Sequence, residues 1–390
     1  MKDNIQQNRL VPELRFAEFQ KLEGWEKKPF SKLFKIGSGR DYKHLDKGAI
    51  PVYGTGGYML SVNDFLYDGK SACIGRKGTI NKPMFLSGKF WTVDTLFYTH
   101  SFEDCSPEFV YLLFQNINWL KYNEAGGVPS LSKNIINKIE VYIPTPQEQQ
   151  KIAATLSSLD DLLQAETERL ALLKEHKKGL LQQLFPKQGE KVPQLRFEEF
   201  VGDGDWEEKM LGDIAKFYSG GTPTSTNQDY YNGDIPFIGS GDISKKNVFK
   251  HLTQQALINS SAKLVRKGDI LYALYGATSG EVAISKISGA INQAVLCIRT
   301  QENQFFLKEV LKYNKSNILS KYIQGGQGNL SADIIKKLIF KFPSIKEQQK
   351  IADTLTSVDK LIAAQAKKIA ALKEHKKGLM QGMFPNTNTL

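Results

Sequence analysis

Two short patterns in this chain combine the residue types of a metal-dependent nuclease site. Asp161 precedes Glu175-His-Lys177, and the same pattern recurs from Asp359 to Lys376. Acidic ligands beside a lysine could hold a divalent cation and stabilise a developing negative charge. On a straight helix, however, the aspartate lies turns away from the other side chains, so the three cannot share one ion. We interpret both patterns as solvated helix surfaces that carry ion pairs.

Other catalytic patterns are missing from the sequence. It contains no Walker A motif, no GxGxxG sequence at the start of a βαβ unit and no Asn-Pro-Pro-aromatic loop. The five histidines have no metal-ligand spacing. Cys73, Cys105 and Cys297 form neither a CxxC motif nor an even set, which favours a reducing compartment over a disulfide framework. We therefore expect a chain that is not catalytic alone and that binds no metal.

Basic and hydrogen-bonding side chains set among glycines and aromatics are better candidates for a binding role, with DNA as the partner. Lys and Arg neutralise phosphates, whereas Arg, Asn, Gln, Ser and Thr read base edges. Any one of them is equally typical of a solvated surface or a turn, so the prediction depends on the whole set. The predicted DNA-binding residues are Arg40, Lys43, Tyr53, Arg76, Lys77 and Lys133 in the first half, and Thr222, Thr224, Lys245, Lys246, Tyr275, Thr278, Ser279, Gln327 and Asn329 in the second.

An internal repeat predicts the long helices that would hold these residues in place. Pro144–Pro186 and Pro343–Pro385 align without a gap and are identical at more than half of their positions. Apolar residues recur in both copies in steps of four and three, which predicts a coiled-coil seam. The predicted seam comprises Ile152, Leu156, Leu159, Leu163, Leu170 and Leu173 in the first copy, and Ile351, Leu355, Val358, Ile362, Ile369 and Leu372 in the second.

Polar residues interrupt this seam at matching places, at Glu166 and Gln365 and again at Lys177 and Lys376. Such residues cost stability but specify register and partner. At ~1.5 Å per residue each helix would be about 50 Å long. Because each copy follows a whole domain, we expect the two helices to run antiparallel within the chain and to separate the two domains. The alternative is a pair of amphipathic helices packed in an ordinary core.

The repeat extends beyond the helices. Val11-Pro-Glu-Leu-Arg-Phe16 recurs as Val192-Pro-Gln-Leu-Arg-Phe197, and Ile50-Pro-Val-Tyr-Gly54 is echoed by Ile235-Pro-Phe-Ile-Gly239. Between these motifs, short alternating runs bounded by Gly and Asp predict strands at 89–93, 269–275 and 294–299. Short helices are predicted at 107–118 and 304–313.

We therefore predict an α+β fold in which two mixed α/β domains are separated by a pair of long antiparallel coiled-coil helices. The expected divisions are an N-terminal segment at 1–24, a first domain at 25–143, a first helix at 144–186, a linker at 187–205, a second domain at 206–342, and a second helix with a tail at 343–390.

Charge is consistent with a polyanionic partner. Lys and Arg number 52 against 41 Asp and Glu, a net charge of +11, and the pI is near 9.2. Most of this excess lies in the two predicted domains, where a reader of nucleic acid needs it. The N-terminus has no apolar signal region and no run is long enough to cross a bilayer, so a cytoplasmic protein is expected.

As a set, these motifs resemble the specificity subunits of type I restriction–modification systems. The resemblance is carried by the paired Pro-x-x-x-Glu-Gln-Gln-Lys-Ile-Ala and Leu-Lys-Glu-His-Lys-Lys-Gly segments of the repeat, and it covers nearly the whole chain. Gly220-Gly-Thr-Pro223, Gly276-Ala-Thr-Ser-Gly280 and Ile291-Asn-Gln293 resemble loops of that family's target-recognition domains. The first domain departs from the pattern, with Ile36-Gly-Ser-Gly39 and Gly75-Arg-Lys-Gly-Thr79 at these places.

The resemblance implies that each domain reads one half of a split, asymmetric target in double-stranded DNA, while the helices set the gap. Two methyltransferase subunits would dock along the helices, with restriction subunits joining through the complex. S-adenosylmethionine, ATP and Mg²⁺ would bind to those partners and not to this chain. Three alternatives remain at this stage: a coiled-coil DNA-binding adaptor of another bipartite methyltransferase or nuclease system, a fused enzyme, and a structural adaptor whose inserts bind protein.

Overall fold

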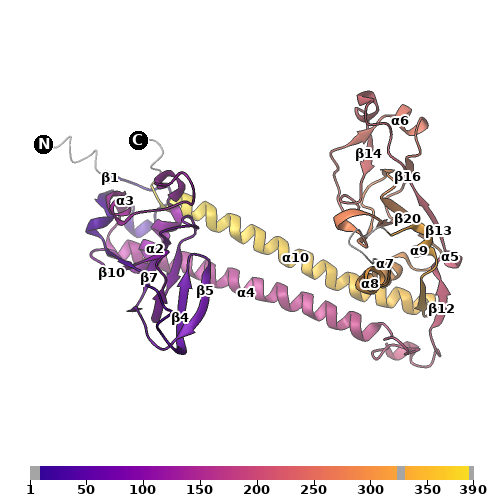
Figure 1. Cartoon of the computed structure of the whole chain (residues 1–390), viewed down its shortest axis with the longest axis horizontal. Helices are drawn as coiled ribbons and strands as arrows, with labels where there is room; N and C mark the ends of the chain where they lie inside the picture. The colour runs from indigo at the N-terminus through magenta and orange to yellow at the C-terminus, as the bar shows by residue number, and fades with distance from the viewer. Residues whose placement is uncertain (1–8, 323–329, 386–390) are drawn as a thin grey trace. The chain divides into compact units, whose positions relative to one another are not determined.

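A computed structural model describes residues 9–322 and 330–385 of the chain. It divides into two compact units: unit 1 contains residues 1–168 and 367–390, and unit 2 contains residues 169–366. Figure 1 labels the elements of both units along the chain. The predicted Gln327 and Asn329 lie outside the described residues. No helix in the described part of the chain is long and apolar enough to cross a membrane.

Two helices of 39 residues each dominate the chain, α4 (Pro146–Leu184) and α10 (Ile345–Met383). The Thr145 hydroxyl accepts from the backbone N–H of Glu148, and the Ser344 hydroxyl accepts from that of Glu347, which caps both N-termini. Each helix is followed by Phe-Pro, where proline cannot continue the hydrogen-bonded ladder. The repeated sequence therefore specifies both the start and the end of each helix.

Within each unit, the segments of α4 and α10 run antiparallel. In unit 1, Lys376 donates to Asp160 at 2.6 Å and Lys368 donates to Glu166 at 2.5 Å, so residue numbers rise along α4 as they fall along α10. In unit 2, Lys177 donates to Asp359 at 2.7 Å. The residues of the predicted seam are all buried or half-buried.

The interpretation of the nuclease-like patterns as solvated surfaces needs correction at Lys177, whereas Asp161, Glu175 and Glu374 are exposed. Lys177 is only 7% exposed, so it does not lie on a solvated helix face. It pairs across the helices with Asp359, and it lies 3.2 Å from the carboxylate of Glu309, which belongs to helix α7 (Gln304–Tyr313). The acid that pairs with Lys376 is Asp160 and not Asp161. Among the described residues, no three His, Cys, Asp or Glu side chains are grouped so that they could hold a metal ion.

Unit 1 contains three sheets with strand orders β1-β2-β11, β3-β10-β7-β8 and β5-β4-β9-β6. Its helices α2 (Pro107–Asn116) and α3 (Lys133–Lys138) begin at the serine caps Ser106 and Ser132. The strands are β1 (Arg9–Leu10), β2 (Trp25–Pro29), β3 (Lys35–Ser38), β4 (Lys47–Gly54), β5 (Gly57–Val62), β6 (Tyr67–Asp68), β7 (Ser71–Gly75), β8 (Met84–Leu86), β9 (Lys89–Thr92), β10 (Leu96–His100) and β11 (Glu140–Ile143).

Unit 2 has the same two four-stranded sheets, β13-β20-β17-β18 and β15-β14-β19-β16, but its remaining sheet, β12-β21, has one strand fewer than β1-β2-β11 in the described part of the chain. Its short helices, besides α7, are α5 (Leu211–Ile214), α6 (Gln254–Ile258), α8 (Lys315–Tyr322) and α9 (Ala332–Lys336). The strands are β12 (Glu207–Met210), β13 (Ala215–Ser219), β14 (Ile235–Ile238), β15 (His251–Leu252), β16 (Lys263–Val265), β17 (Ile270–Ala273), β18 (Val282–Ile284), β19 (Gly289–Ile291), β20 (Val295–Thr300) and β21 (Ile339–Phe342).

The short elements predicted from the sequence appear with small shifts. Helix α7 has the predicted bounds, whereas α2 ends two residues earlier than expected because Ile117 adopts an extended backbone. The predicted strands correspond to β9, β17 and β20.

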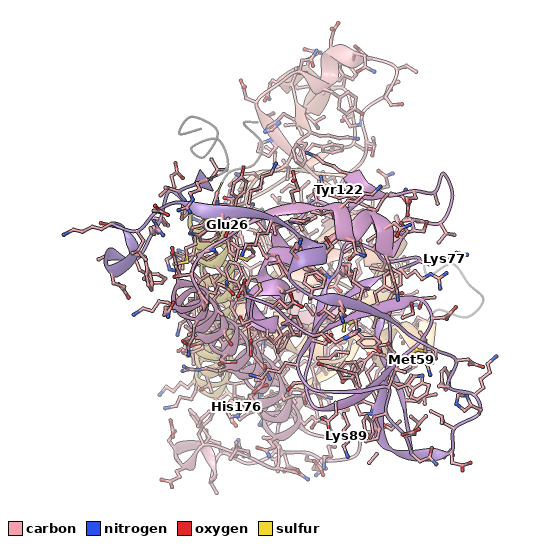
Figure 2. All side chains as sticks on the ribbon, turned by 90° about the vertical axis from the view of Figure 1, so that its left-hand side faces the viewer. Glu26, Met59, Lys77, Lys89, Tyr122 and His176 are labelled. Carbon is pink, nitrogen blue, oxygen red and sulfur yellow. The ribbon has the colours of Figure 1, made fainter. Side chains whose placement is uncertain are left out.

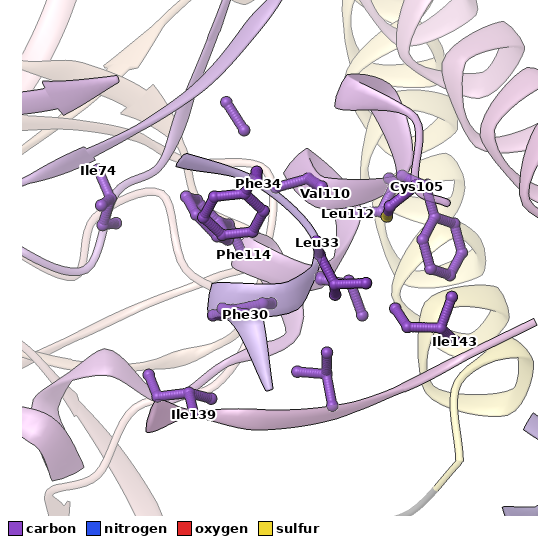
Figure 3. Packing of buried hydrophobic residues seen from close by; sticks show 14 of the residues in the cluster. Phe30, Leu33, Phe34, Ile74, Cys105, Val110, Leu112, Phe114, Ile139 and Ile143 are labelled. Carbon is purple, nitrogen blue, oxygen red and sulfur yellow. The ribbon is translucent and has the colours of Figure 1, made fainter. Parts of the chain in front are cut away.

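An aromatic core closes unit 1 around the end of α10. Phe384 is 3% exposed, and its ring stacks on Phe109 at 5.5 Å and meets Trp25 edge-on at 5.7 Å. Figure 3 shows the neighbouring part of the same cluster, where Phe30, Phe34 and Phe114 pack together. In unit 2, Phe185 at the end of α4 occupies the matching place. Each core therefore includes the terminus of a helix that begins in the other unit.

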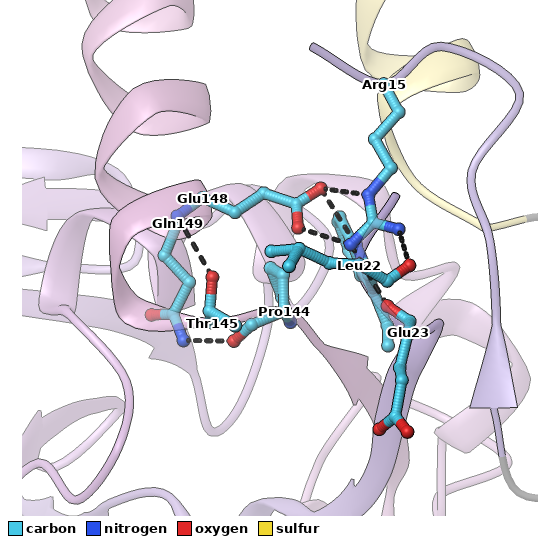
Figure 4. Close-up of polar contacts among 8 residues, drawn as sticks. Arg15, Leu22, Glu23, Pro144, Thr145, Glu148 and Gln149 are labelled. Atoms are coloured by element: carbon cyan, nitrogen blue, oxygen red, sulfur yellow. Dashed lines mark hydrogen bonds and ion pairs between the residues drawn. The ribbon is translucent and has the colours of Figure 1, made fainter. Parts of the chain in front are cut away.

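A buried polar clamp explains why the Val-Pro-x-Leu-Arg-Phe and Glu-Gln-Gln motifs recur together. Arg15 donates to both carboxylate oxygens of Glu148 at 2.9 and 2.8 Å, and to the carbonyls of Leu22 and Glu23 (Figure 4). Gln149 donates to the carbonyl of Pro144 at 3.0 Å. In unit 2 the same clamp joins two further residues, Arg196 and Glu347. Removing either partner of this bidentate, almost fully buried pair would leave an uncompensated charge in the interior. Each unit therefore needs both motifs.

Candidate DNA-binding surface

The predicted DNA-binding residues lie mainly on loops at one edge of a sheet in each unit. In unit 1, β4 and β9 are parallel, with Tyr53 opposite Thr92. In unit 2, β14 and β19 are parallel, with Ile238 opposite Ile291. Because parallel strands end at the same edge, the loops that follow them emerge together. Loops fixed on a rigid sheet are a common place for recognition.

Backbone hydrogen bonds tie the loops of unit 1 into one surface. The Arg40 N–H donates to the carbonyl of Thr92 at 2.8 Å, and the Arg76 N–H donates to that of Thr95 at 2.7 Å. The Leu131 N–H in turn donates to the carbonyl of Arg76 at 2.8 Å. These bonds join the loops after β3, β7 and β9 to the loop before α3. The loop backbones are thereby held in place without any ligand.

Two adjoining hollows follow this surface. One, of about 700 Å³, is lined by Arg76, Lys77 and Lys133. The other, of about 570 Å³, is lined by Lys43 and by the hairpin between β4 and β5. Asp94 and Thr95 border both hollows, so the two adjoin, and the remaining lining residues include Glu124, Asp41, Tyr58 and Met59. Figure 2 shows Lys77 and Met59 projecting from the same side of unit 1.

Basic and acidic side chains both border the hollows, the acids being Asp41, Asp94 and Glu124. On β10, burial together with the charges of Lys35 and Lys133 lowers the pKa of His100. The Lys133 ammonium lies 5.9 Å from the ring centroid of Phe97. Arg40, Lys43, Arg76 and Lys77 are exposed. The surface therefore presents four exposed cations above a hydrogen-bonded loop framework.

In unit 2, side chains as well as backbone groups join the loops. Thr222 donates from its hydroxyl to Oε1 of Gln293 at 2.7 Å, and the Leu274 N–H donates to the carbonyl of Ala294 at 2.9 Å. These bonds connect the loop after β13 with those after β17 and β19. Thr224 and Lys246 are exposed, whereas Tyr275 and Thr278 are half-buried.

Some predicted residues have a structural explanation. Ser279 is only 9% exposed, and its hydroxyl donates to the carbonyl of Leu274 at 3.1 Å. Lys245 is ion-paired with Asp242 at 2.7 Å. Tyr53 is half-buried, and its ring lies edge-on to that of Tyr58 at 6.2 Å. Ser279 therefore shapes its loop, and Tyr58, which sequence reasoning missed, is the more exposed of the two tyrosines.

Close backbone approach requires a glycine at the same place in each unit. A Cβ atom on Gly39 would lie 1.9 Å from the carbonyl oxygen of Val93, and one on Gly220 would lie 1.7 Å from that of Ile291. Both contacts are far inside the distance that real Cβ atoms reach. The two glycines let the loops after β3 and β13 cross the ends of the parallel pairs β4–β9 and β14–β19.

This arrangement has the features of a binding surface. It offers cations for phosphates, together with hydroxyl and amide groups of the type that reads base edges. The three cysteines are free and buried, and burial raises the pKa of each thiol to about 12, so they supply no nucleophile to it. The loops of the two units differ in sequence, which predicts different base preferences.

Comparison of the fold places the chain among known structures. The S subunit of a type I restriction–modification system from M. genitalium superposes with a TM-score of 0.67 at 17% sequence identity, covering 97% of this chain and 100% of that one. A structure of a type I restriction–modification system also matches, with a TM-score of 0.55, 16% identity, and 93% of this chain and 98% of that chain covered. The chain therefore shares its fold with these structures.

The sequence comparison identifies the family. The type I restriction modification DNA specificity domain matches residues 22–175 and again residues 203–374, and the chain belongs to this family. The MjaVIII specificity subunit of Methanocaldococcus jannaschii is 25% identical over 346 residues, 83% of this chain and 78% of that protein. The MjaX specificity subunit of the same organism is 26% identical over 284 residues, 70% of this chain, and the match spans 65% of that protein's length.

Proposed function

We propose that this chain selects the DNA target of a type I restriction–modification complex in the cytoplasm, with each unit reading one half of a bipartite, asymmetric sequence. The observation that carries the proposal is that the two units have matching sheets and a matching loop surface, with different side chains on the loops. Two unlike readers on a single chain suit two unlike half-sites. The basic residues would hold phosphates and set affinity, and the loop hydroxyl and amide groups would read bases.

The helices α4 and α10 would set the gap between the half-sites. At ~1.5 Å per residue, 39 residues extend about 58 Å. Half-site centres one helical turn of DNA apart, about 34 Å, fall within that length. Two methyltransferase subunits would dock on the helices and bring S-adenosylmethionine, flipping out an adenine for N6 methylation. Restriction subunits would join through this complex with ATP and Mg²⁺.

Methylome sequencing of cells that carry this chain with its partner subunits tests the proposal. We expect one interrupted, asymmetric motif. Replacing residues 206–342 with the corresponding domain of another family member should change one half of that motif and leave the other half and the gap unchanged. Deleting seven residues from each helix, in register with each other, should shorten the gap alone. A continuous motif, or an exchange that altered both halves, would contradict the proposal.

A further inference from the structure

The segment Gly239–Lys250 joins β14 to β15 in unit 2 and differs from its counterpart in unit 1. There, the tight hairpin Gly54–Gly57 makes the same connection. The longer segment is nevertheless anchored. Ile243 is 5% exposed and Val248 is 9% exposed, and the Phe237 N–H donates to the carbonyl of Lys250 at 2.8 Å. The added residues therefore form an ordered loop at the edge of the sheet where β14 and β19 end.

Phe249 lies on this loop and is 99% exposed. Its direction is imposed by its neighbours, because Val248 is buried and the carbonyl of Lys250 is held by Phe237. The chain bends at Phe249 itself, and its side chain points into solvent. Burial of such a large apolar side chain is favourable, so leaving it in water is unfavourable in the free protein. A side chain held outward in this way is poised for a partner.

The charges around Phe249 indicate which partner. Lys245, Lys246 and Lys250 are exposed within five positions of it. The only acidic residue in the segment is Asp242, and it is ion-paired with Lys245. An apolar ring surrounded by cations suits a polyanion that carries stacked apolar faces, which describes duplex DNA. Proteins that deform DNA often insert such a side chain between neighbouring base pairs.

Unit 1 has a related feature at the equivalent position. Ser61 and His251 are the residues opposite the prolines of the two Ile-Pro motifs. The second residue before Ser61 is Met59, which is 48% exposed, and the second before His251 is Phe249. Met59 lines the same hollow as Lys43. Both units therefore place an exposed apolar side chain beside basic residues at this position.

We propose that Phe249 inserts partly between two base pairs of the half-site read by unit 2, while Lys246 and Lys250 hold the flanking phosphates. The inference depends on the proposed function, because it assigns a residue to that unit's DNA contact. Partial insertion deforms the DNA, and the free energy of that deformation depends on the base sequence. Unit 2 would therefore favour a flexible pyrimidine–purine step at this point, even though no base edge is read there.

The assembled methyltransferase complex, on a duplex that contains its mapped motif, provides the test. Phe249→Ala should weaken binding about tenfold or more, as loss of one base–aromatic stack does, and Phe249→Trp should restore most of it. Lys246→Ala should instead make the fall of log K with log[salt] less steep by about one, which is the contribution of one phosphate contact. Ile258→Ala is the matched control, because Ile258 is also an exposed apolar residue of unit 2, at 67%. It should leave binding unchanged.

A fluorescent base analogue, 2-aminopurine, placed at successive positions of the half-site reports unstacking directly. Its emission should rise at the flipped adenine with both complexes, and at one further step with the unaltered complex but not with Phe249→Ala. Equal affinity of the alanine variant and the unaltered complex would overturn the inference, as would an unchanged 2-aminopurine signal or a loss of methyltransferase assembly in place of DNA binding. If the unaltered complex recognised no bipartite motif at all, the proposed function itself would fail.

Discussion

The buried clamp between Arg15 and Glu148 makes a prediction whose size follows from the structure. The side chains of Arg15 and Glu148 are 4% and 1% exposed, and the carboxylate otherwise accepts one bond from a neighbouring side chain, the indole N–H of Trp25 at 3.2 Å. Arg15→Ala would leave this carboxylate buried without its charge partner. Breaking a buried pair in this way costs about 3–5 kcal/mol.

Because both residues belong to unit 1, the loss should be local. Native-state hydrogen exchange monitors it, since amide protection reports the free energy of opening for each region. Arg15→Ala should accelerate exchange in α2 and β11 and leave β17 and β20 of unit 2 unchanged. The matched control is Arg9→Ala, which removes an exposed ion pair with Glu23 and should cost about 0–1 kcal/mol.

A double-mutant cycle completes the test. Adding Glu148→Gln to Arg15→Ala should recover part of the loss, because the uncompensated charge is then gone, and a coupling of about 1–3 kcal/mol is expected. Coupling near zero would refute the reasoning. So would an equal loss of protection in both units, because the clamp would then not act locally.

Three further predictions concern the cores and loops. Phe384→Ala should destabilise unit 1 by about 3–5 kcal/mol, whereas Phe185→Ala should do the same in unit 2, and hydrogen exchange would distinguish the two. Gly39→Ala should abolish recognition of the half-site read by unit 1 in a binding assay, whereas Gly56→Ala, whose Cβ would meet nothing within 4 Å, should not. Burial raises the pKa of the three cysteine thiols to about 12, against 9.0 in the unfolded chain, so the folded state retains protons that the unfolded state loses. Unfolding titrations should therefore show stability falling as pH rises above about 9, and the native thiols should resist a disulfide reagent at pH 8.

Much of the architecture is predictable because its signals are periodic and repeated. The steps of four and three in the helical copies and the recurrence of Ile-Pro before a strand follow from side-chain periodicity alone. The roles of Lys177 and Ser279 were predictable only in part. The heptad period assigned Lys177 to the seam but gave no sign of its partner Glu309, and Ser279, expected to contact DNA, bonds within its own loop.

The exposed aromatic residues are a second case in which residue type misleads, because it predicts burial where the structure shows exposure. Tyr58 and Phe249 resemble core residues by type, and hydropathy assigns them inward. The register of β5 shows that Tyr58 faces outward, because a shift of one residue exchanges the two faces of a strand, and the fold of the segment before β15 exposes Phe249. Their signal in the sequence was indirect: Tyr58 follows a pair of glycines, and Phe249 stands among lysines.

By itself, the sequence determined the internal repeat, the two long helices, the α+β class and the family, because each depends on local spacing or on motifs that stand next to one another. The tertiary structure decided which residues meet: Arg15 with Glu148, Phe384 with Trp25, and the loops after β4 and β9 at one sheet edge. The repeat predicts that the two helices run antiparallel, but it does not say which of their side chains meet. Contacts between residues far apart in the chain depend on strand pairing and on helix packing within each unit, which are properties of the folded chain that no local pattern encodes.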